Sequence, residues 1–291
     1  MAKNIFEGAA TALITPFKHG KLDLDAFERL IEAQISAKIS ALVVCGTTGE
    51  SPTLSDDEKF TLFEFAAKTA NGRVPVIAGT GSNCTDHAVK LSKLAEKAGC
   101  DALLAVTPYY NKGTPDGLFS HYEKIAKSTS LPLVAYNVPS RTGVSIPLPV
   151  LKKLTEKGLI CALKEASGDM NRAVEIAAEI PDLTLYSGND DRILPFYSIG
   201  GRGVVSVLSN IFPKETQKMC ELYSDGKTDE ATALQLKFLP FINLLFAEVN
   251  PSPVKYAAHR MGLCECEYRL PLTRPSGDLC RRIDEELEKL K

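Results

Sequence analysis

Residues 40–78, SALVVCGTTGESPTLSDDEKFTLFEFAAKTANGRVPVIA, contain the unit from which the fold can be predicted. The runs Ser40–Cys45 and Pro75–Ala78 are short and almost wholly apolar, which is typical of strands that are buried on both faces of a sheet. Between them, Ser55–Ala70 carries apolar residues at helical spacing and begins with a Ser-x-x-Glu capping box. A strand, a helix and a second strand in this order favour a parallel sheet.

The same unit recurs along most of the chain, and successive strand candidates start roughly 20–35 residues apart. The strand candidates are Ala9–Ile14, Ser40–Cys45, Pro75–Ala78, Asp101–Val106, Pro132–Tyr136, Ile160–Lys164, Leu183–Tyr186 and Gly203–Val207. The helix candidates between them include Leu24–Ala37, Ser55–Ala70, Thr85–Ala98, Gly117–Ser128 and Asn171–Glu179. Eight such units predict an α/β fold, a closed (β/α)8 TIM barrel. An open doubly wound sheet is the weaker alternative, because no GxGxxG motif follows the first strand.

The strand pattern stops after residue 225, and the rest of the chain has the periodicity of helices. The expected helices are Glu230–Val249, Pro253–Met261 and Ser276–Leu290. We therefore expect two parts, a catalytic barrel over residues 1–225 and a C-terminal helical appendage over residues 226–291.

Charge and hydropathy exclude several classes of protein. The 291 residues include 34 Lys and Arg against 36 Asp and Glu, a formal net charge of −2. This balance gives no electrostatic case for a nucleic-acid or membrane-surface partner. The longest apolar stretch, residues 236–249, is interrupted by Lys237 and Glu248, so no membrane span is expected.

Cysteine and histidine usage bears on location and on metals. The eight cysteines form no Cys-x-x-Cys pair, and the first residues lack the pattern of a signal peptide. We therefore expect a cytoplasmic protein with reduced thiols. The four histidines lie far apart in the sequence, without metal-ligand spacing, so no metal site is predicted.

Active sites of (β/α)8 barrels lie at the carboxyl ends of the strands, so the polar residues that follow each strand candidate are the ones to examine. The segment Gly46–Ser51, GTTGES, follows the second strand. Its glycines and paired threonines can direct backbone N–H groups and hydroxyls at an anion. A tight turn whose threonines bond the local backbone is the structural alternative.

The fourth and fifth strand candidates are followed by tyrosines and an arginine. Tyr109 and Tyr110 stand side by side in a loop, where they serve either a site or a packing interface. Tyr136 ends the fifth strand and can relay protons if neighbours hold its hydroxyl. Arg141 follows a few residues later and offers a bidentate fork for a carboxylate, or else a surface charge.

The sixth strand candidate carries the most informative residue. Residues 159–163 are almost wholly apolar, and Lys164 follows them directly. Burial of its ammonium lowers the pKa of a lysine, and a neutral amine attacks carbonyl carbon to form a Schiff base. An ion pair with a neighbouring acid, or extension of the side chain to solvent, is the structural alternative.

A rival interpretation comes from Gly200–Gly203, GGRG, beside the eighth strand candidate. Many barrels bind phosphate near this strand. A phosphate-ligand barrel would use this loop and form no imine.

Six motifs, taken together and in order, identify a family. They are GTTGES, TPYYN, YNVPSRT, LKEASGD, SGND and NPSPVK, and the resemblance that they carry runs nearly from end to end of the chain. With them the chain resembles the pyruvate-dependent class I aldolases, and within these the dihydrodipicolinate synthase family. The resemblance implies a (β/α)8 barrel that condenses pyruvate with L-aspartate 4-semialdehyde through a lysine Schiff base. The product would be 4-hydroxy-tetrahydrodipicolinate, in diaminopimelate and lysine biosynthesis.

The resemblance also implies roles for individual residues. Lys164 would form the Schiff base, and Tyr136 would relay protons through Thr48 to Tyr110 of a neighbouring subunit. Thr47 and Thr48 would hold the pyruvate carboxylate, and Arg141 the carboxylate of the semialdehyde. The backbone of two further residues would line the pocket, namely Gly188 and Val205. The family implies no metal or organic cofactor, and a homotetramer built as a dimer of dimers.

Other members of the superfamily stay open as alternatives. N-acetylneuraminate lyases and 2-keto-3-deoxy sugar-acid aldolases share the lysine and the tyrosine, so these two residues do not discriminate. The segment Ser140–Thr142, with Arg141 at its centre, favours the semialdehyde over a sugar. A non-catalytic barrel is a further alternative, because a fold does not determine a function.

Family members that lysine inhibits use an allosteric site beside the tyrosine pair. The matching positions here are Ser51, Asp56, Lys59, Asn83, His87 and Tyr109. At the position of Lys59 such members commonly carry a histidine, and at the position of His87 they commonly carry a glutamate. A cation in place of an attractive partner disfavours a cationic ligand, so we expect weak or absent inhibition by lysine.

Overall fold

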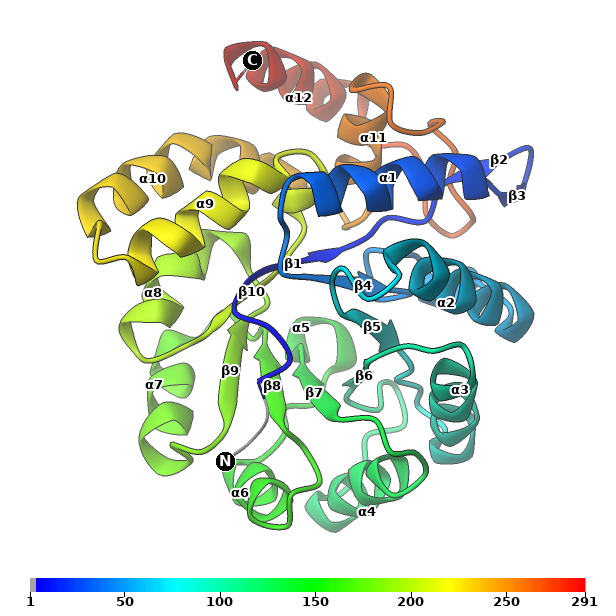
Figure 1. Ribbon diagram of the computed structural model, residues 1–291, viewed down its shortest axis with the longest axis vertical. Helices are drawn as coiled ribbons and strands as arrows, with labels where there is room; N and C mark the ends of the chain where they lie inside the picture. Colours follow the sequence, from blue (N-terminus) through cyan, green and yellow to red (C-terminus); the bar gives the residue numbers. More distant parts are fainter. Residues whose placement is uncertain (1–3, 291) are drawn as a thin grey trace.

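The computed structural model describes residues 4–290, and its centre is a closed barrel of eight parallel strands (Figure 1). The strands are β1 (Gly8–Ala12), β4 (Ala41–Val44), β5 (Val76–Gly79), β6 (Ala102–Val106), β7 (Leu133–Asn137), β8 (Ala162–Glu165), β9 (Thr184–Ser187) and β10 (Gly203–Ser206). Each strand pairs with the next in this order, and β10 closes the barrel against β1. The predicted (β/α)8 fold is confirmed, with every strand candidate within two residues of an observed strand at either end.

Helices surround the barrel and cover its outer face. They are α1 (Leu24–Ser36), α2 (Asp56–Ala70), α3 (Thr85–Lys97), α4 (Pro115–Ala126), α6 (Leu148–Glu156), α7 (Met170–Glu179), α8 (Ile193–Ser198) and α9 (Pro213–Ser224). The capping box that starts α2 is present, with reciprocal bonds between Ser55 and Glu58. Helix α4 begins two residues before its expected start, because Thr114 caps it and Pro115 suits the first turn.

The consecutive apolar residues of each strand face two different apolar clusters. One cluster fills the inside of the barrel and includes Ala10, Val43 and Leu104. The other lies between the strands and the helices and includes Leu42 and Leu103. This double burial is the physical reason that the strands show no alternation of polar and apolar residues.

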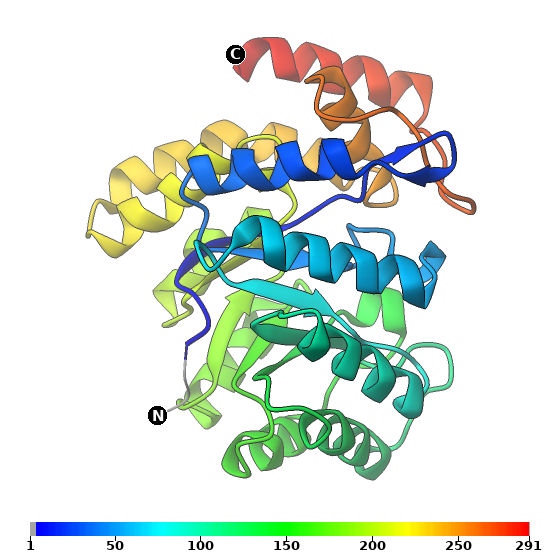
Figure 2. The ribbon, with the colours of Figure 1, turned by 45° about the vertical axis from the view of Figure 1, so that its right-hand side comes forward.

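The C-terminal helices are α10 (Thr228–Leu245), α11 (Ser252–Arg260) and α12 (Gly277–Leu290), and they lie together at one side of the barrel (Figures 1 and 2). Helix α10 packs on α9, where the ring of Phe212 meets those of Phe238 and Phe241 at centroid distances of 5.0 and 5.4 Å. The division after residue 225 remains a prediction. None of the helices described within residues 4–290 has the length and apolarity of a membrane span.

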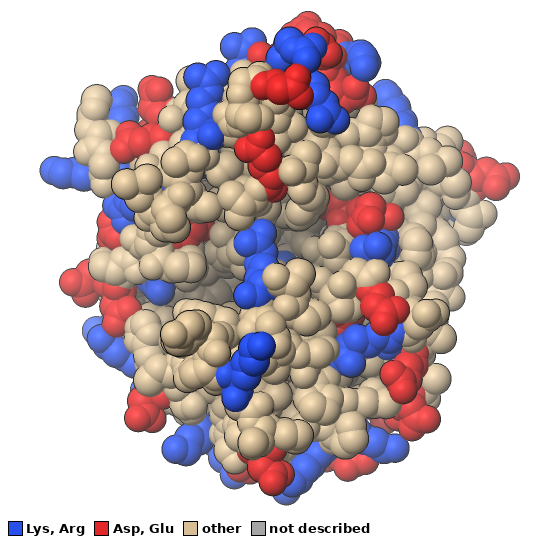
Figure 3. Space-filling view, turned by 180° about the vertical axis from the view of Figure 1, so that it is seen from behind, with Lys and Arg blue, Asp and Glu red and all other residues tan. Residues whose placement is uncertain are grey.

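The two ends of the barrel differ. At the amino ends of the strands, the rings of Phe6 and Tyr186 stack with centroids 4.1 Å apart, and the Tyr186 hydroxyl donates to the Phe6 carbonyl at 2.9 Å. The opposite face of the molecule is hollowed near its middle, with basic side chains around the hollow (Figure 3). The strands end toward this hollow, so it is the place to look for a site.

Candidate active site

The ends of β7 and β8 bring together the residues expected to carry the chemistry. These strands pair in register, with Tyr136 opposite Lys164 and Asn137 opposite Glu165. Because side chains alternate along a strand, Tyr136 and Lys164 face the inside of the barrel, and their two neighbours face the helices. Both side chains line one cavity at the carboxyl ends of the strands.

Lys164 is buried, with 7% of its surface exposed, and its Nζ lies 4.3 Å from the centroid of the Tyr136 ring. No carboxylate of the described residues forms an ion pair with it. Burial lowers its pKa from 10.5 to about 7; the negative charge of Asp190 opposes this shift and the positive charge of Arg141 adds to it. The neutral, nucleophilic amine is therefore a major species near neutral pH.

The two threonine side chains in the turn after β4 have different hydrogen-bond partners. The Tyr136 side chain hydrogen-bonds the side chain of Thr47. The hydroxyl of Thr48 instead accepts a bond of 3.1 Å from Nδ2 of Asn250. Within this chain Tyr136 therefore bonds Thr47 and not Thr48, because the turn directs the two adjacent side chains to different neighbours. The proton relay itself stays a prediction.

Arg141 lies on a single helical turn, α5 (Pro139–Thr142), directly after β7. Its Nη2 donates to the backbone carbonyl of Asn250 at 3.1 Å, which leaves other guanidinium donors available for a ligand. Burial raises the pKa of Tyr136, and the charge of Arg141 and the hydrogen bond with Thr47 both oppose this rise. The tyrosine is therefore protonated at neutral pH and able to donate.

Gly188 follows β9 and is packed directly against Lys164. A Cβ at this position would lie 2.4 Å from the Cβ of Ala166 and 3.1 Å from the Cε of Lys164. No larger residue fits without displacing the lysine. The Gly188 amide donates to the carbonyl of Glu165 at 2.8 Å, so only its carbonyl can face a ligand.

These residues enclose a cavity of about 130 Å³. Among its lining residues are Thr47, Thr48, Tyr136, Arg141, Lys164, Gly188, Asn189, Val207, Phe246 and Asn250. Val205 belongs to the apolar cluster inside the barrel, and the β10-side residue that lines the cavity is Val207. The role of Val205 as a lining residue stays a prediction.

The site residue that sequence reasoning missed is Asn250, which precedes α11. It holds Thr48 through its side chain and Arg141 through its carbonyl. Five residues on, the fully buried Lys255 forms an ion pair with Glu50 of the GTTGES segment. The only signal in the sequence was the NPSPVK motif, which begins at Asn250 and contains both residues.

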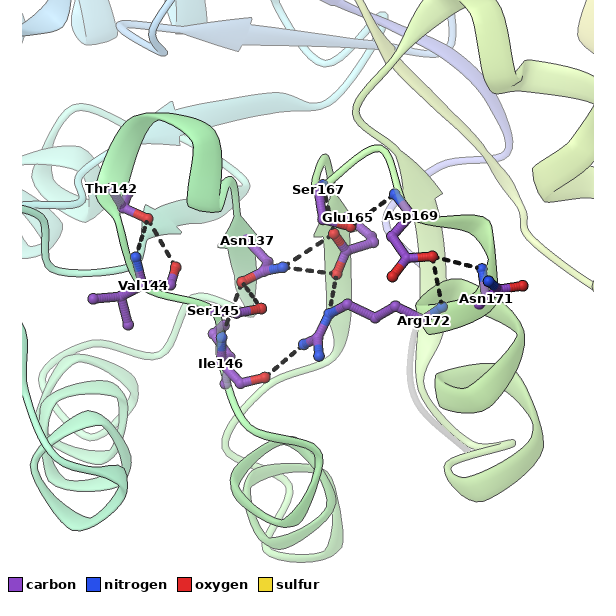
Figure 4. A network of polar contacts seen from close by, with 10 residues as sticks. All are labelled: Asn137, Thr142, Val144, Ser145, Ile146, Glu165, Ser167, Asp169, Asn171 and Arg172. Carbon is purple, nitrogen blue, oxygen red and sulfur yellow. Dashed lines mark hydrogen bonds and ion pairs between the residues drawn. The ribbon is translucent and has the colours of Figure 1, made fainter.

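Glu165, the neighbour of Lys164, faces the helices and fastens the strand ends to each other (Figure 4). Both of its carboxylate oxygens accept from Asn137 Nδ2, at 3.0 and 2.9 Å, and Oε2 also accepts from Arg172 Nε at 3.2 Å. Asn137 in turn accepts a bond from the Ile146 amide. This network links β7, β8 and α7, and it fixes the two strand ends that present Tyr136 and Lys164.

Tyr110 is not brought to the cavity of its own chain. It lies in the loop after β6, is 91% exposed, and has a positive φ of 70° that is unusual for an aromatic residue. A strained backbone that holds a large aromatic ring in solvent is consistent with a contact to another subunit.

A second and larger cavity, of about 380 Å³, shares a wall with the first. The residues that line both are Gly46, Thr47, Leu104, Tyr136, Val138 and Arg141. Five of the six expected allosteric positions line the larger cavity, namely Ser51, Asp56, Lys59, His87 and Tyr109. Asn83 does not, and its carbonyl accepts from Asn111 Nδ2 at 2.9 Å.

The glycine-rich segment Gly200–Gly203 is at the wrong end of the barrel for the phosphate interpretation. It precedes β10, so it lies at the amino ends of the strands. Its amides at Gly200, Gly201 and Arg202 already donate to carbonyls of this chain. Within residues 4–290, no group of three or more His, Cys, Asp or Glu side chains is placed to hold a metal ion.

Comparisons with known proteins place the chain in a family. A sequence model described as the Dihydrodipicolinate synthetase family matches residues 5–290. The chain is 50% identical over 270 residues to a 4-hydroxy-tetrahydrodipicolinate synthase from Caldicellulosiruptor saccharolyticus, covering 92% of both chains. It is 46% identical over 286 residues to one from Alkaliphilus oremlandii, covering 98% of this chain and 99% of the relative.

A solved structure is similarly close. The crystal structure of dihydrodipicolinate synthase from Aquifex aeolicus superimposes with a TM-score of 0.96 at 40% identity, covering 98% of each chain. The likeness therefore includes the C-terminal helices as well as the barrel.

Proposed function

The chain belongs to the dihydrodipicolinate synthetase family, and from this premise we propose that Lys164 condenses pyruvate with L-aspartate 4-semialdehyde through a Schiff base. The activity is that of a 4-hydroxy-tetrahydrodipicolinate synthase, an aldolase-type lyase. The observation that carries the residue assignment is the buried Lys164, whose burial lowers its pKa to about 7, with its amine against the Tyr136 ring in a small cavity.

The first half of the reaction makes a nucleophile from pyruvate. The neutral amine of Lys164 attacks the ketone carbon, and loss of water leaves an imine that draws electrons from the adjacent methyl group. A proton leaves that methyl group, and an enamine forms. Tyr136 gives and takes the protons of these steps, and Thr47 holds its hydroxyl in place.

The second half uses the aldehyde. The enamine carbon attacks the aldehyde carbon of the semialdehyde and forms the new carbon–carbon bond. The amine of the bound substrate then attacks the imine carbon and releases Lys164, and the ring closes. Arg141, at the mouth of the cavity, pairs with the carboxylate of the semialdehyde and orients it.

The assembly belongs to the proposal as well. Tyr110 of a neighbouring subunit continues the proton relay of Tyr136 and Thr47. The protein works as a homotetramer, a dimer of dimers. The exposure and the positive φ of Tyr110 support this assignment. We place the protein in the cytoplasm, where its eight cysteines, all of them free, would stay reduced.

Product formation from pyruvate and different aldehydes tests the function directly. Turnover with L-aspartate 4-semialdehyde should exceed turnover with N-acetylmannosamine and with sugar aldehydes. Preferred turnover of a sugar aldehyde would assign the chain to another branch of the pyruvate aldolases.

Arg141→Met should raise KM for the semialdehyde about 10- to 100-fold, because it removes a charge-assisted bond to the substrate carboxylate. Imine formation with pyruvate should change far less. Steady-state kinetics with each substrate varied in turn, together with the rate of imine formation, provide the measurement. Equal losses in both steps would contradict the role given to Arg141.

L-lysine should inhibit weakly or not at all. Lys59 lines the larger cavity, and Asp56, the acid beside it, is already paired with His87 and Lys90 at 2.8 and 2.7 Å. A cationic ligand would meet the positive charge of Lys59. Titration of the synthase reaction with L-lysine gives the measurement, and half-maximal inhibition at a sub-millimolar concentration would refute this expectation.

A further inference from the structure

The side chain of Asn250 carries a hydrogen-bond acceptor without a partner. This residue is only 5% exposed, it lines the smaller cavity, and its Nδ2 donates to Thr48. The other end of the same amide, Oδ1, is buried and has no hydrogen-bond partner among residues 4–290. A buried acceptor without a partner is unfavourable, and a ligand that donates to it restores the missing bond.

Asn250 joins the two side chains that are expected to hold the substrate carboxylates. Its Nδ2 lies 3.1 Å from the hydroxyl of Thr48, which is expected at the pyruvate carboxylate. Its backbone carbonyl lies 3.1 Å from Nη2 of Arg141, which is expected at the carboxylate of the semialdehyde. The unpaired oxygen therefore belongs to a residue that contacts both of these side chains.

The amine of the semialdehyde is a donor that fits this acceptor. It is bonded to the carbon next to the carboxylate, so a carboxylate held by Arg141 keeps the amine near that side chain. In the proposed ring closure the same amine attacks the imine carbon, which is next to the pyruvate carboxylate expected at Thr48. The amine thus moves from the surroundings of Arg141 toward those of Thr48, the two side chains that Asn250 joins.

The smaller cavity offers this amine a neutral acceptor and no carboxylate. None of the described residues that line it is Asp or Glu. A carboxylate would stabilise the ammonium form of the amine, which has no lone pair and cannot attack the imine. An amide oxygen accepts an N–H bond from the ammonium and from the neutral amine alike. It therefore suits a group that is bound first and reacts later.

We propose that Oδ1 of Asn250 accepts a hydrogen bond from the amine of the bound semialdehyde, and so selects an amino-acid aldehyde over an aldehyde that lacks the amine. The inference rests on the proposed function and makes its substrate recognition more specific. Arg141 binds the carboxylate of the second substrate, and Asn250 binds the amine.

4-Oxobutanoate tests this assignment, because it keeps the aldehyde and the carboxylate of the semialdehyde and lacks only the amine. At saturating pyruvate, Asn250→Leu should raise KM for L-aspartate 4-semialdehyde about 10- to 100-fold. The inhibition constant of 4-oxobutanoate against the same reaction should change far less. Asn243→Leu, at an exposed position of α10, is the matched control and should change neither constant.

The comparison of the two ligands separates recognition of the amine from a structural role. Leucine also removes the bond to Thr48, but that loss weakens both ligands alike, so the difference between them reports on the amine. Asn250→Asp keeps the size of the side chain and an acceptor oxygen. It should retain the preference for the amine-bearing aldehyde even if the leucine variant folds poorly.

Three results would overturn the inference. In a folded Asn250→Leu variant, KM for the semialdehyde could stay at the wild-type value, or both constants could rise by similar factors. Alternatively, a folded Asn250→Asp variant could lose the preference for the amine-bearing aldehyde. Any of these would show that Oδ1 does not bind the amine.

Failure of the inference is distinguishable from failure of the proposed function. A wild type without synthase activity would overturn the proposed function and the inference with it. An active wild type in which Asn250→Leu affects both ligands alike would overturn the inference alone, because imine formation at Lys164 is measured separately.

Discussion

Replacement of Lys164 by methionine should lower kcat by a factor on the order of 10⁴ or more, because it removes the amine that forms the covalent intermediate. Methionine fills a similar volume, and Gly188 leaves no space for rearrangement beside it. The protein should therefore fold normally. Steady-state turnover of pyruvate and semialdehyde gives the measurement, with circular dichroism as the check on folding.

The matched control is Lys153→Met on the outer surface of α6, which should leave kcat unchanged. The pH profile of the wild type belongs to the same prediction. Since the reactive form is the neutral amine, and burial lowers the pKa of Lys164 to about 7, kcat/KM for pyruvate should rise with pH through about 7. A folded methionine variant with near-normal kcat would contradict the assignment of Lys164.

Tyr136→Phe should lower kcat roughly 10²- to 10⁴-fold, the range for loss of a positioned acid–base group. The phenylalanine ring keeps the contact with Lys164 but loses the hydroxyl that Thr47 holds. Thr47→Val should produce a smaller loss in the same direction. Pre-steady-state measurement of imine formation and of complete turnover shows which proton transfers have slowed.

The matched control for Tyr136→Phe is Tyr186→Phe. This tyrosine also lies inside the barrel, but its hydroxyl bonds the Phe6 carbonyl at the opposite end. Its loss should destabilise the fold by about 1 kcal/mol and leave kcat unchanged. Similar kcat losses in the two variants would show that the effect of Tyr136→Phe is structural.

The architecture could be predicted because the chain alternates doubly buried strands with amphipathic helices, and only a few topologies accommodate that order. Lys164 could be predicted for a related reason, since a lysine directly after an apolar strand reaches the open end of a barrel. The phosphate interpretation of Gly200–Gly203 fails because this segment precedes its strand. Its position before β10 places it at the amino ends, away from the site.

Two features of the site depend on geometry that the sequence does not reveal. The different partners of Thr47 and Thr48 arise in a turn with positive φ at both Cys45 and Glu50, where side-chain directions depend on backbone angles. Asn250 bonds Thr48 across a separation of 202 residues, so no local pattern could place it in the site.

The most direct test of the account is reduction with borohydride in the presence of pyruvate, followed by intact-mass spectrometry and peptide mapping. One pyruvate-derived adduct per chain is expected, located on Lys164 and absent from Lys164→Met. A folded wild-type protein that forms no adduct, or that carries the adduct on another lysine, would contradict the assignment of Lys164 as the Schiff-base residue.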